Sequence, residues 1–407
     1  MIAATNTASC VWLSPPLPFA SNSVYRLTYR VRGEEVNGLV NSGTTFLNVD
    51  SHAQTNWVEC SRIIAALNTT EALASLRLGQ WESKGRLYFD DVRLTPVTPV
   101  YATASDVTLG EGERIEHLTY SFQAPFQSEC LSHSRPFHAA TAHYNSTRWC
   151  LGPNSVVIYN HALPQRTFQS AQLTVNCGYY SSGSARIEWS SDNQTWQTVG
   201  AITGTGPVAV TLPPAVRFVR LCGEKRCSLQ IYDYAFRAQL TGAPLTLVGA
   251  THYVEVEQTR PGLDLVVQAL GSGLPGAANV MTFAVKNAQA TTIEAHIAFT
   301  PMQNELRTPP APQRQRLALP AGAHTLSIPY DSPGCGTWLM TVNINDTYTL
   351  RSTVTVPDFY EANYGERLPS RSDDVALWCA SSGWKIPKTR ALPHAKTRRM
   401  TDRKSVV

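Results

Sequence analysis

The sequence predicts an all-β protein built from tandem antiparallel β-sandwiches. Charged residues make up only 16% of the 407 residues, and the chain contains 25 Gly and 26 Pro. This composition favours short strands and turns over long helices. Apolar and polar residues also alternate along many short segments, and turn residues separate these segments. The length is that of about two to three domains.

Residues 1–100 read as strands separated by turns, with alternating segments at 23–33, 43–50 and 56–63. The run 76–94 reads LRLGQWESKGRLYFDDVRL, and a break at 83–85 divides it into two apolar segments. We expect an antiparallel hairpin here, with a β-bulge where Asp90 and Asp91 interrupt the alternation. The Pro- and Thr-rich residues 95–105 are expected to form a linker.

Two further blocks follow. In the block 105–242, the alternating segment 186–196 contains a turn at Asp192 and Asn193, after which Trp196 is expected to return to the core. In the block 247–356, short alternating segments recur at the spacing of an immunoglobulin-like sandwich.

Several motifs resemble known modules. The run 76–94 resembles the end of CenC-type carbohydrate-binding jelly rolls, in which a DDV strand closes the domain. The segments RIEWSSDNQTW and VRFVRL resemble parts of discoidin-like sandwiches. LGEGE (109–113) and DDVALWCASSGWK (373–385) resemble the N-terminal region of glycoside hydrolase family 123-like proteins.

The resemblance implies a domain order. Residues 1–100 would be a truncated CenC-type jelly roll, 105–242 a discoidin-like sandwich, and 247–356 an immunoglobulin-like sandwich. Residues 357–407 would begin the N-terminal domain of a family 123-like protein. The chain would then be a fragment that lacks the catalytic barrel.

By this resemblance, the chain is a non-catalytic, carbohydrate-binding accessory region of an exported, modular bacterial glycoside hydrolase. Its partner would be a polysaccharide or another glycan, and the absent domain would hydrolyse the glycosidic bonds. We expect an extracellular or periplasmic location; no signal peptide is visible, and the first strands of the jelly roll look cut off. The alternative is a surface adhesion or structural protein whose sandwiches bind protein or glycan partners.

Other classes are disfavoured. The formal charge of +4 is concentrated in a basic tail from Lys385 onward, so the rest of the chain is slightly acidic and does not suggest nucleic-acid binding. No run reaches the roughly 18 apolar residues of a membrane-spanning helix. The sequence contains no GxSxG, HExxH or P-loop motif, so nothing in it marks this chain itself as an enzyme.

The candidate sugar site combines aromatic rings with polar side chains. A pyranose ring stacks on aromatic faces, while amides, carboxylates and Arg bind its hydroxyls. The alternative places Trp81 in the core or at its rim. Trp57 is expected to point inward and belong to the core. The candidate carbohydrate-binding residues are Trp81, Tyr88, Glu82, Arg86, Asn48 and Asp50.

Asp90 and Asp91 have two interpretations. Paired hard oxygen ligands could hold a structural calcium ion, although no cofactor is required. The favoured alternative is a bulge with exposed carboxylates that protects an edge strand. The chain contains nine cysteines, and Cys10 with Cys60 and Cys222 with Cys227 could form disulfides. The alternative, that these cysteines are buried free thiols, is equally consistent with the sequence.

Overall fold

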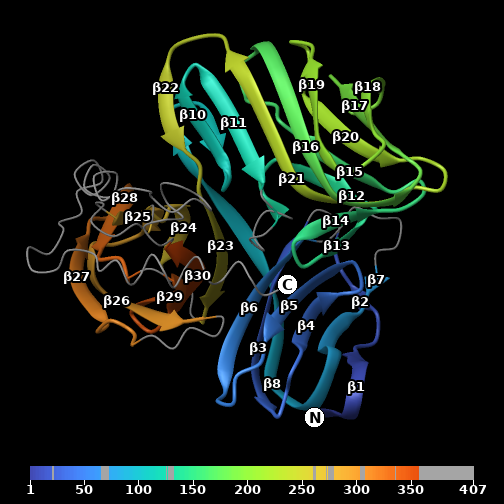
Figure 1. The fold of residues 1–407 in the computed structure, drawn as a ribbon. Coiled ribbons are helices and arrows are strands. Elements are labelled where there is room, and N and C mark those ends of the chain that lie inside the picture. Colours follow the sequence, from blue (N-terminus) through green and yellow to red (C-terminus); the bar gives the residue numbers. More distant parts are fainter. Residues whose placement is uncertain are drawn as a thin grey trace, which may run out of the picture.

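The described part of the chain is built from strands alone. The computed structural model describes residues 1–20, 23–65, 73–124, 126, 133–259, 263–271, 273, 279–302, 308–334 and 336–356. These residues form 30 strands, which confirms the predicted all-β class (Figure 1). None of them lies in a helix long and apolar enough to cross a membrane. Residues 357–407, with the motif at 373–385, lie outside the described residues.

The first strands form an N-terminal sandwich, seen at the lower right of Figure 1. One sheet has the order β1–β8–β4–β5, and the other has the order β8–β3–β6. Its strands are β1 (Ile2–Leu13), β2 (Leu17–Pro18), β3 (Val24–Glu34), β4 (Leu39–Thr44), β5 (Leu47–His52), β6 (Val58–Ala65), β7 (Leu73–Ala74) and β8 (Leu76–Ala104).

Strand β8 replaces both the expected hairpin and the expected linker. It runs for 29 residues without a turn. Its first part pairs with β1 and β4, and its middle pairs with β3. Residues 95–105 do not form a linker, because β8 continues through Ala104 and pairs there with β23 and β9. The break at 83–85 is a bend within one strand, where Gly85 has a φ of 107°.

The expected β-bulge is confirmed. Opposite β8, Arg30 pairs with Asp90 and Thr28 pairs with Arg93, so two residues of β8 face Tyr29 alone. Asp91 adopts a φ of 49°, and its N–H donates to Asp90 Oδ1 at 2.9 Å. Asp is one of the few residues other than Gly that tolerate this left-handed conformation, and the side chain of Asp90 satisfies the Asp91 N–H.

The middle sandwich packs one sheet of order β22–β10–β11–β21–β16–β19 on another of order β12–β15–β20–β17–β18. Their inner faces share a core of aromatic and aliphatic side chains. The strands are β9 (Val107–Leu109), β10 (Glu113–His117), β11 (Thr119–Ala124), β12 (Phe137–Ala140), β13 (His143–Asn145), β14 (Arg148–Leu151), β15 (Val156–Asn160), β16 (Phe168–Ser182), β17 (Ala185–Ser190), β18 (Gln197–Ile202), β19 (Gly206–Leu212), β20 (Phe218–Gly223), β21 (Ser228–Leu240) and β22 (Leu245–Val248).

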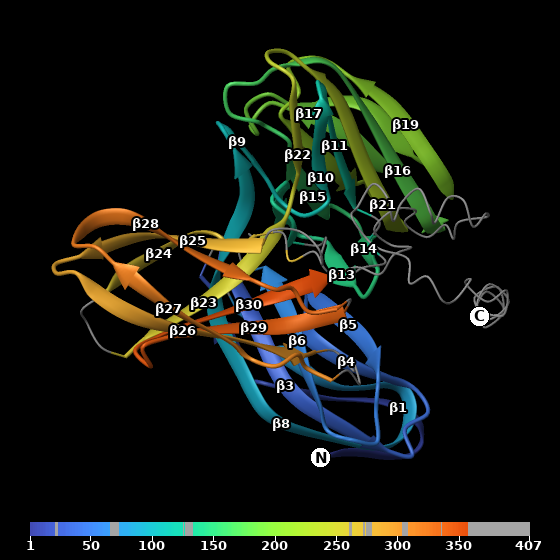
Figure 2. The same cartoon turned by 90° about the vertical axis from the view of Figure 1, so that its left-hand side faces the viewer.

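The C-terminal sandwich contains the strands expected from alternation in 247–356. One sheet has the order β23–β30–β29–β26–β27 and the other β24–β25–β28. Figure 2 shows β8 passing along β23 into this sandwich. The strands are β23 (Thr251–Gln258), β24 (Asp264–Ala269), β25 (Asn279–Asn287), β26 (Thr291–Pro301), β27 (Gln313–Leu319), β28 (Gly322–Tyr330), β29 (Gly336–Ile344) and β30 (Tyr348–Val356).

Buried apolar side chains form two clusters. One runs from Leu27 to Leu240 through the N-terminal and middle sandwiches, and the other fills the C-terminal sandwich from Val254 to Val356. The residue limits of the domains stay a proposal. Neither conceivable disulfide is formed, since the six described cysteines are free: Cys10, Cys60, Cys150, Cys177, Cys222 and Cys227.

The bend in β8 generates a stability prediction. A Cβ at Gly85 would lie 2.5 Å from Glu35 O and 2.7 Å from Glu34 O, in a backbone conformation that other residues avoid. We expect Gly85→Ala to lower the free energy of unfolding by about 1–3 kcal/mol, measured by urea denaturation. Gly204→Ala is the matched control, because nothing lies within 4 Å of the added Cβ. Equal stability of the two variants would contradict the role of Gly85.

Candidate functional site

One exposed sheet face of the N-terminal sandwich gathers aromatic and charged side chains from β3, from β8 and from Trp57, the residue that precedes β6. In β3, Tyr29 and Val31 point into the core, so the residues between and beyond them point outward. Arg32 and Glu34 of β3 pair with Tyr88 and Arg86 of β8. We call this surface the Trp57–Tyr88 platform, and it consists of Arg30, Arg32, Glu34, Trp57, Arg86 and Tyr88.

The arginines of the platform lie against its rings. The Arg32 guanidinium is 4.3 Å from the centroid of the Tyr88 ring and 5.4 Å from that of the Trp57 ring. Arg30 is also 5.4 Å from the Trp57 centroid. Each such exposed cation–π contact stabilises by about 0.5–1 kcal/mol. The contacts therefore hold the rings in place on an open surface.

Glu34 connects the polar atoms of the platform. Arg32 Nη1 donates to Glu34 Oε1 at 3.0 Å, and the Tyr88 hydroxyl donates to Glu34 Oε2 at 3.0 Å. Arg86 Nη1 lies 3.8 Å from the same Oε2. The platform thus offers an exposed aromatic ring beside oriented donors and acceptors, which is the chemistry that binds sugars.

The expectation that Trp57 belongs to the core is wrong, since its side chain is 39% exposed. It immediately precedes β6, in which Val58 and Cys60 pair with Val31 and Tyr29 of the core face. Trp57 is adjacent to Val58 in the chain, so alternation places its side chain on the opposite, outward face of the sheet. The segment is too short for alternation alone to fix which of its residues point inward.

The six residues predicted for a sugar site do not gather in one place. Tyr88 and Arg86 lie on the platform, whereas Trp81 lies earlier in β8, where that strand pairs with β4. Trp81 is 47% exposed, so it is not a core residue. Glu82 lies at the bend with a φ of 44°, and its N–H donates to Ser9 Oγ at 3.1 Å.

Asn48 and Asp50 contribute to a contact between two sandwiches. β5 pairs in parallel with β13, matching Asn48 with Asn145. Asn48 Nδ2 donates to Asn145 Oδ1 at 3.2 Å, and Ser146 Oγ donates to Asp50 Oδ2 at 2.6 Å. Asn41 Nδ2 also donates to Asp50 Oδ1 at 2.9 Å. These polar atoms already have partners within the protein, on a different sheet from Tyr88.

The surroundings of Asp90 and Asp91 favour the exposed bulge. Arg30 Nη1 lies 3.8 Å from Asp91 Oδ2, and Asp90 Oδ1 accepts the Asp91 N–H. Within the described ranges, no group of three or more His, Cys, Asp or Glu side chains is placed to hold a metal ion. Calcium takes six to eight oxygen ligands, and the adjacent arginine does not suit a cation. Calcium binding at this pair stays a prediction.

A second polar cluster is buried in the middle sandwich. Arg135 Nε donates to Glu113 Oε2 at 2.6 Å, and the Tyr120 hydroxyl donates to Glu113 Oε1 at 2.7 Å. The Tyr120 hydroxyl also contacts His161 Nδ1 at 3.3 Å, and His161 Nε2 contacts the Tyr234 hydroxyl at 2.8 Å. Sequence reasoning named Glu113 only within LGEGE and missed its partners, Tyr120 on the next strand and Arg135, 22 residues along the chain.

Burial dominates the proton affinities in this cluster. It raises the pKa of Tyr120, and the charge of Glu113 raises it further. Burial also lowers the pKa of His161, and the charge of Arg135 adds to this effect. Glu113 has no exposed side-chain surface. Perturbed pKa values can mark catalytic sites, but ion-pair networks in a core perturb them as well, and a substrate cannot reach this one.

Tyr253 connects all three sandwiches. Its carbonyl oxygen accepts a hydrogen bond from Arg26 Nη2 of β3, and its hydroxyl lies 2.5 Å from His133 Nδ1. Arg26 also lies 3.7 Å from Glu255 on β23. Burial lowers the pKa of His133 to about 3, so the imidazole is neutral at this junction.

No protein-family model and no curated protein matches the chain. Among solved structures, it is similar to Bacteroides uniformis β-glucuronidase 2 covalently bound to cyclophellitol-6-carboxylate aziridine, at 14% identity over 51% of this chain and 27% of that chain, with a TM-score of 0.16. It is also similar to a GH2 β-galacturonidase from Eisenbergiella tayi bound to galacturonate, at 9% identity over 50% of this chain and 35% of that chain, with a TM-score of 0.16.

A calcium-binding mutant of the same Bacteroides uniformis enzyme is similar at 13% identity over 62% of this chain and 32% of that chain, with a TM-score of 0.17. The matches therefore span about a third or less of these glycosidases. At such TM-scores they carry no argument about the function of this chain.

The buried His133 generates a prediction about pH. Its folded pKa of about 3 lies below the ordinary 6.5, so between these values the unfolded chain binds more protons than the folded one. The stabilising contribution is therefore complete above about pH 6.5 and is lost progressively as the pH falls toward 3, by on the order of 1 kcal/mol per pH unit. We expect His133→Gln to flatten the dependence of the thermal midpoint on pH between 7 and 4.5.

The slope is the measured quantity, because His133→Gln also alters the contact with Tyr253 and so lowers the midpoint itself. His52→Gln, at an exposed position, is the control and should keep the slope of the parent. A His133→Gln slope equal to that of the parent would show that this imidazole does not couple folding to protons.

Proposed function

We propose that this chain is a non-catalytic, glycan-binding accessory region of a modular glycoside hydrolase that acts outside the cytoplasm. The observation that carries the proposal is the Trp57–Tyr88 platform. It combines an exposed indole, a second ring and fixed polar groups on one open sheet face. The family 123-like resemblance of the sequence adds the context of a glycosidase, and the proposal requires no cofactor.

The platform suits an extended saccharide. Trp57 and Tyr88 lie on either side of Arg32, so the rings are separated along the face instead of stacked on each other. An apolar face of a sugar ring can lie on the exposed part of the indole, while Arg86 and Glu34 reach the hydroxyls of the neighbouring unit. Nothing in this arrangement encloses a single small molecule.

The carboxylates favour a binding role over a catalytic one. A glycosidase needs two carboxyl groups that flank one glycosidic bond, one of them with a raised pKa. On the platform, Glu34 is engaged by Arg32 and Tyr88. The buried carboxylate of Glu113 is bonded to Arg135 and Tyr120 inside the middle sandwich. Neither group has the environment of a general acid facing a substrate.

A specific observation also favours the second candidate, an adhesion protein. Val11, Trp12 and Leu13 at the end of β1 are 38%, 48% and 50% exposed. Among the described strands, β1 pairs only with β8. An edge strand with exposed apolar side chains can accept a strand from a protein partner. This candidate predicts protein binding that Trp57 does not influence.

The platform generates a binding prediction. Affinity electrophoresis through gels that contain neutral polysaccharides should retard the parent chain. Trp57→Ala removes the exposed ring, and we expect it to weaken binding at least tenfold, a loss of about 1.4 kcal/mol. Tyr88→Phe keeps the ring and removes only the hydroxyl that donates to Glu34, so a smaller loss is expected.

Trp81→Ala is the matched control, because it deletes an indole that is 47% exposed, against 39% for Trp57, from the other sheet. The platform would be supported as the binding site if the gel retards Trp81→Ala as much as the parent chain but no longer retards Trp57→Ala. Loss in Trp81→Ala alone would instead place binding on the β1–β8–β4–β5 sheet. Unchanged mobility of the parent and every variant on all the polysaccharides would contradict the proposed function.

A further inference from the structure

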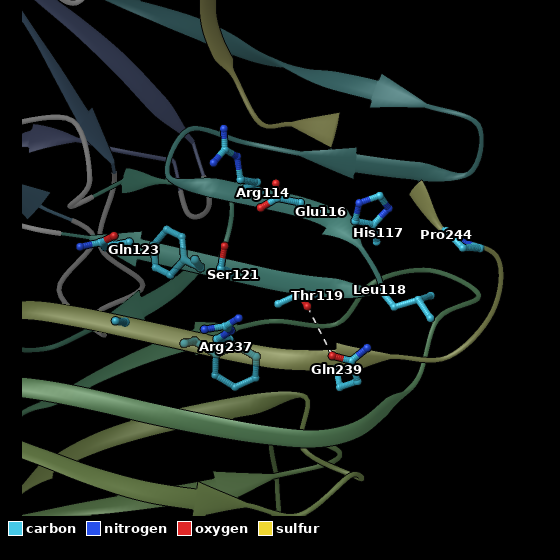
Figure 3. Close-up of a pocket in the computed structure, with 13 residues that line it drawn as sticks. Arg114, Glu116, His117, Leu118, Thr119, Ser121, Gln123, Arg237, Gln239 and Pro244 are labelled. Carbon is cyan, nitrogen blue, oxygen red and sulfur yellow. Dashed lines mark hydrogen bonds between the residues drawn. The ribbon is translucent and has the colours of Figure 1, made fainter. Parts of the chain in front are cut away.

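The middle sandwich carries a groove on the outer face of β10, β11 and β21 (Figure 3). The groove has a volume of about 740 Å³. Ile115, Tyr120 and Phe236 of these strands point into the core, so the alternate residues face the groove. Figure 3 shows Arg114 and Glu116 extending from β10, and Arg237 and Gln239 from β21. No motif in the sequence indicated this surface.

Two arginines lie on either side of the groove. Arg114 pairs across the strands with Ser121, and Ser121 pairs with Arg237. Two strand spacings place the Arg114 and Arg237 backbones roughly 10 Å apart. Neither guanidinium forms an ion pair within the described part of the chain, although Glu116 lies two residues from Arg114 on the same face. The groove therefore offers two separate cations without an ion-pair partner among the described residues, together with one carboxylate, that of Glu116.

Among the residues that line the groove, the exposed aromatic ring is the imidazole of His117 at the end of β10, and no exposed Phe, Tyr or Trp offers a larger face for stacking. Phe122 and Phe236 border it but are 0% and 1% exposed, because their side chains belong to the core. Ser121 lies between the two arginines, and the neighbouring row along the strands is Glu116, Thr119 and Gln239, in which Thr119 Oγ1 donates to Gln239 Oε1 at 3.4 Å. Single-stranded nucleic acids need aromatic platforms, and peptides need pockets for side chains. Hydroxyl-rich polymers need neither.

We infer that this groove binds a polyuronate, an acidic polysaccharide whose carboxylates pair with Arg114 and Arg237. The planar guanidinium fork matches a carboxylate in two parallel hydrogen bonds. The chain itself forms such a pair where Arg135 Nε and Nη2 donate to the two carboxylate oxygens of Glu113. The side chains of Ser121, Thr119 and Gln239 then bind the sugar hydroxyls.

This site is distinct from the Trp57–Tyr88 platform in position and in chemistry. The platform arginines Arg32 and Arg30 are paired with Glu34 and Asp91, whereas the groove arginines are not. The choice of a polysaccharide rests on the proposed function, but the binding of an anionic group rests on the groove alone. An experiment can therefore contradict one of the two proposals without contradicting the other.

The test is affinity electrophoresis of the full chain through gels that contain polygalacturonate, dextran sulfate or neutral dextran. We expect polygalacturonate to retard the parent. Arg114→Gln and Arg237→Gln should each raise the apparent dissociation constant about tenfold, and the double variant about a hundredfold. Arg114→Lys with Arg237→Lys keeps the charge but loses the fork, and an intermediate affinity would support carboxylate pairing.

Arg217→Gln with Arg226→Gln is the matched control, because it removes two exposed charges outside the groove. It should retain the parent's affinity for polygalacturonate, as should Trp57→Ala. The affinity of a variant is compared with that of the parent only if its thermal unfolding midpoint equals the parent's. If a Gln variant does not fold, the Lys variants supply the test.

The inference would be overturned by no retardation of the parent by polygalacturonate, by equal loss in the control double variant, or by tighter retention by dextran sulfate. Soluble polyglutamate serves as a competitor. If soluble polyglutamate displaces the chain from polygalacturonate as well as soluble polygalacturonate does at the same carboxylate concentration, the groove recognises charge alone. That result would also overturn the assignment to a polysaccharide. Loss of neutral-glycan binding in Trp57→Ala, with polygalacturonate binding retained, would leave both proposals standing.

Discussion

The arrangement of the molecule depends on the continuity of strand β8. This strand belongs in turn to both sheets of the N-terminal sandwich and to the first sheet of the C-terminal one, and it ends against β9. A straight strand cannot join two packed sheets, so β8 must bend. Gly85 supplies a backbone conformation that avoids a clash with the carbonyl oxygens of Glu34 and Glu35. The bulge at Asp91 increases the local twist. The bend at Gly85 and this bulge together allow one strand to belong to three sheets.

Side-chain contacts at Tyr253 connect the sandwiches that β8 joins. A neutral His133, Tyr253 and the Arg26 guanidinium form a buried path from the middle sandwich through the C-terminal sandwich to the N-terminal one. Burial lowers the pKa of Arg26 to about 10, so it still carries its charge at neutral pH, beside Glu255. Breaking one partner of such a buried set leaves the other uncompensated. These contacts keep the residues that join the sandwiches away from solvent.

Local alternation predicted much of the fold and little of the candidate site. The run 279–287 alternates cleanly and forms β25, and the interruption at Asp90 and Asp91 is a bulge as expected. The break at 83–85 was misread as a turn, because a glycine with positive φ serves a turn and a bend within a strand equally well. Trp57 was assigned to the wrong face because its register is fixed by pairing with β3. Partners such as His133 and Tyr253, 120 residues apart, leave no local signal at all.

The two exposed faces differ because of how their charges are balanced. On the platform, Glu34 and Asp91 each lie beside an arginine, so Arg32 and Arg30 are paired within the face that carries the rings. In the groove, the outward residues of β11 are neutral, and Arg114 and Arg237 have no such neighbour across the strands. Screening by salt acts over about 8–10 Å at physiological ionic strength. Salt should therefore weaken the proposed attraction of an anion to the groove far more than the proposed stacking on Trp57.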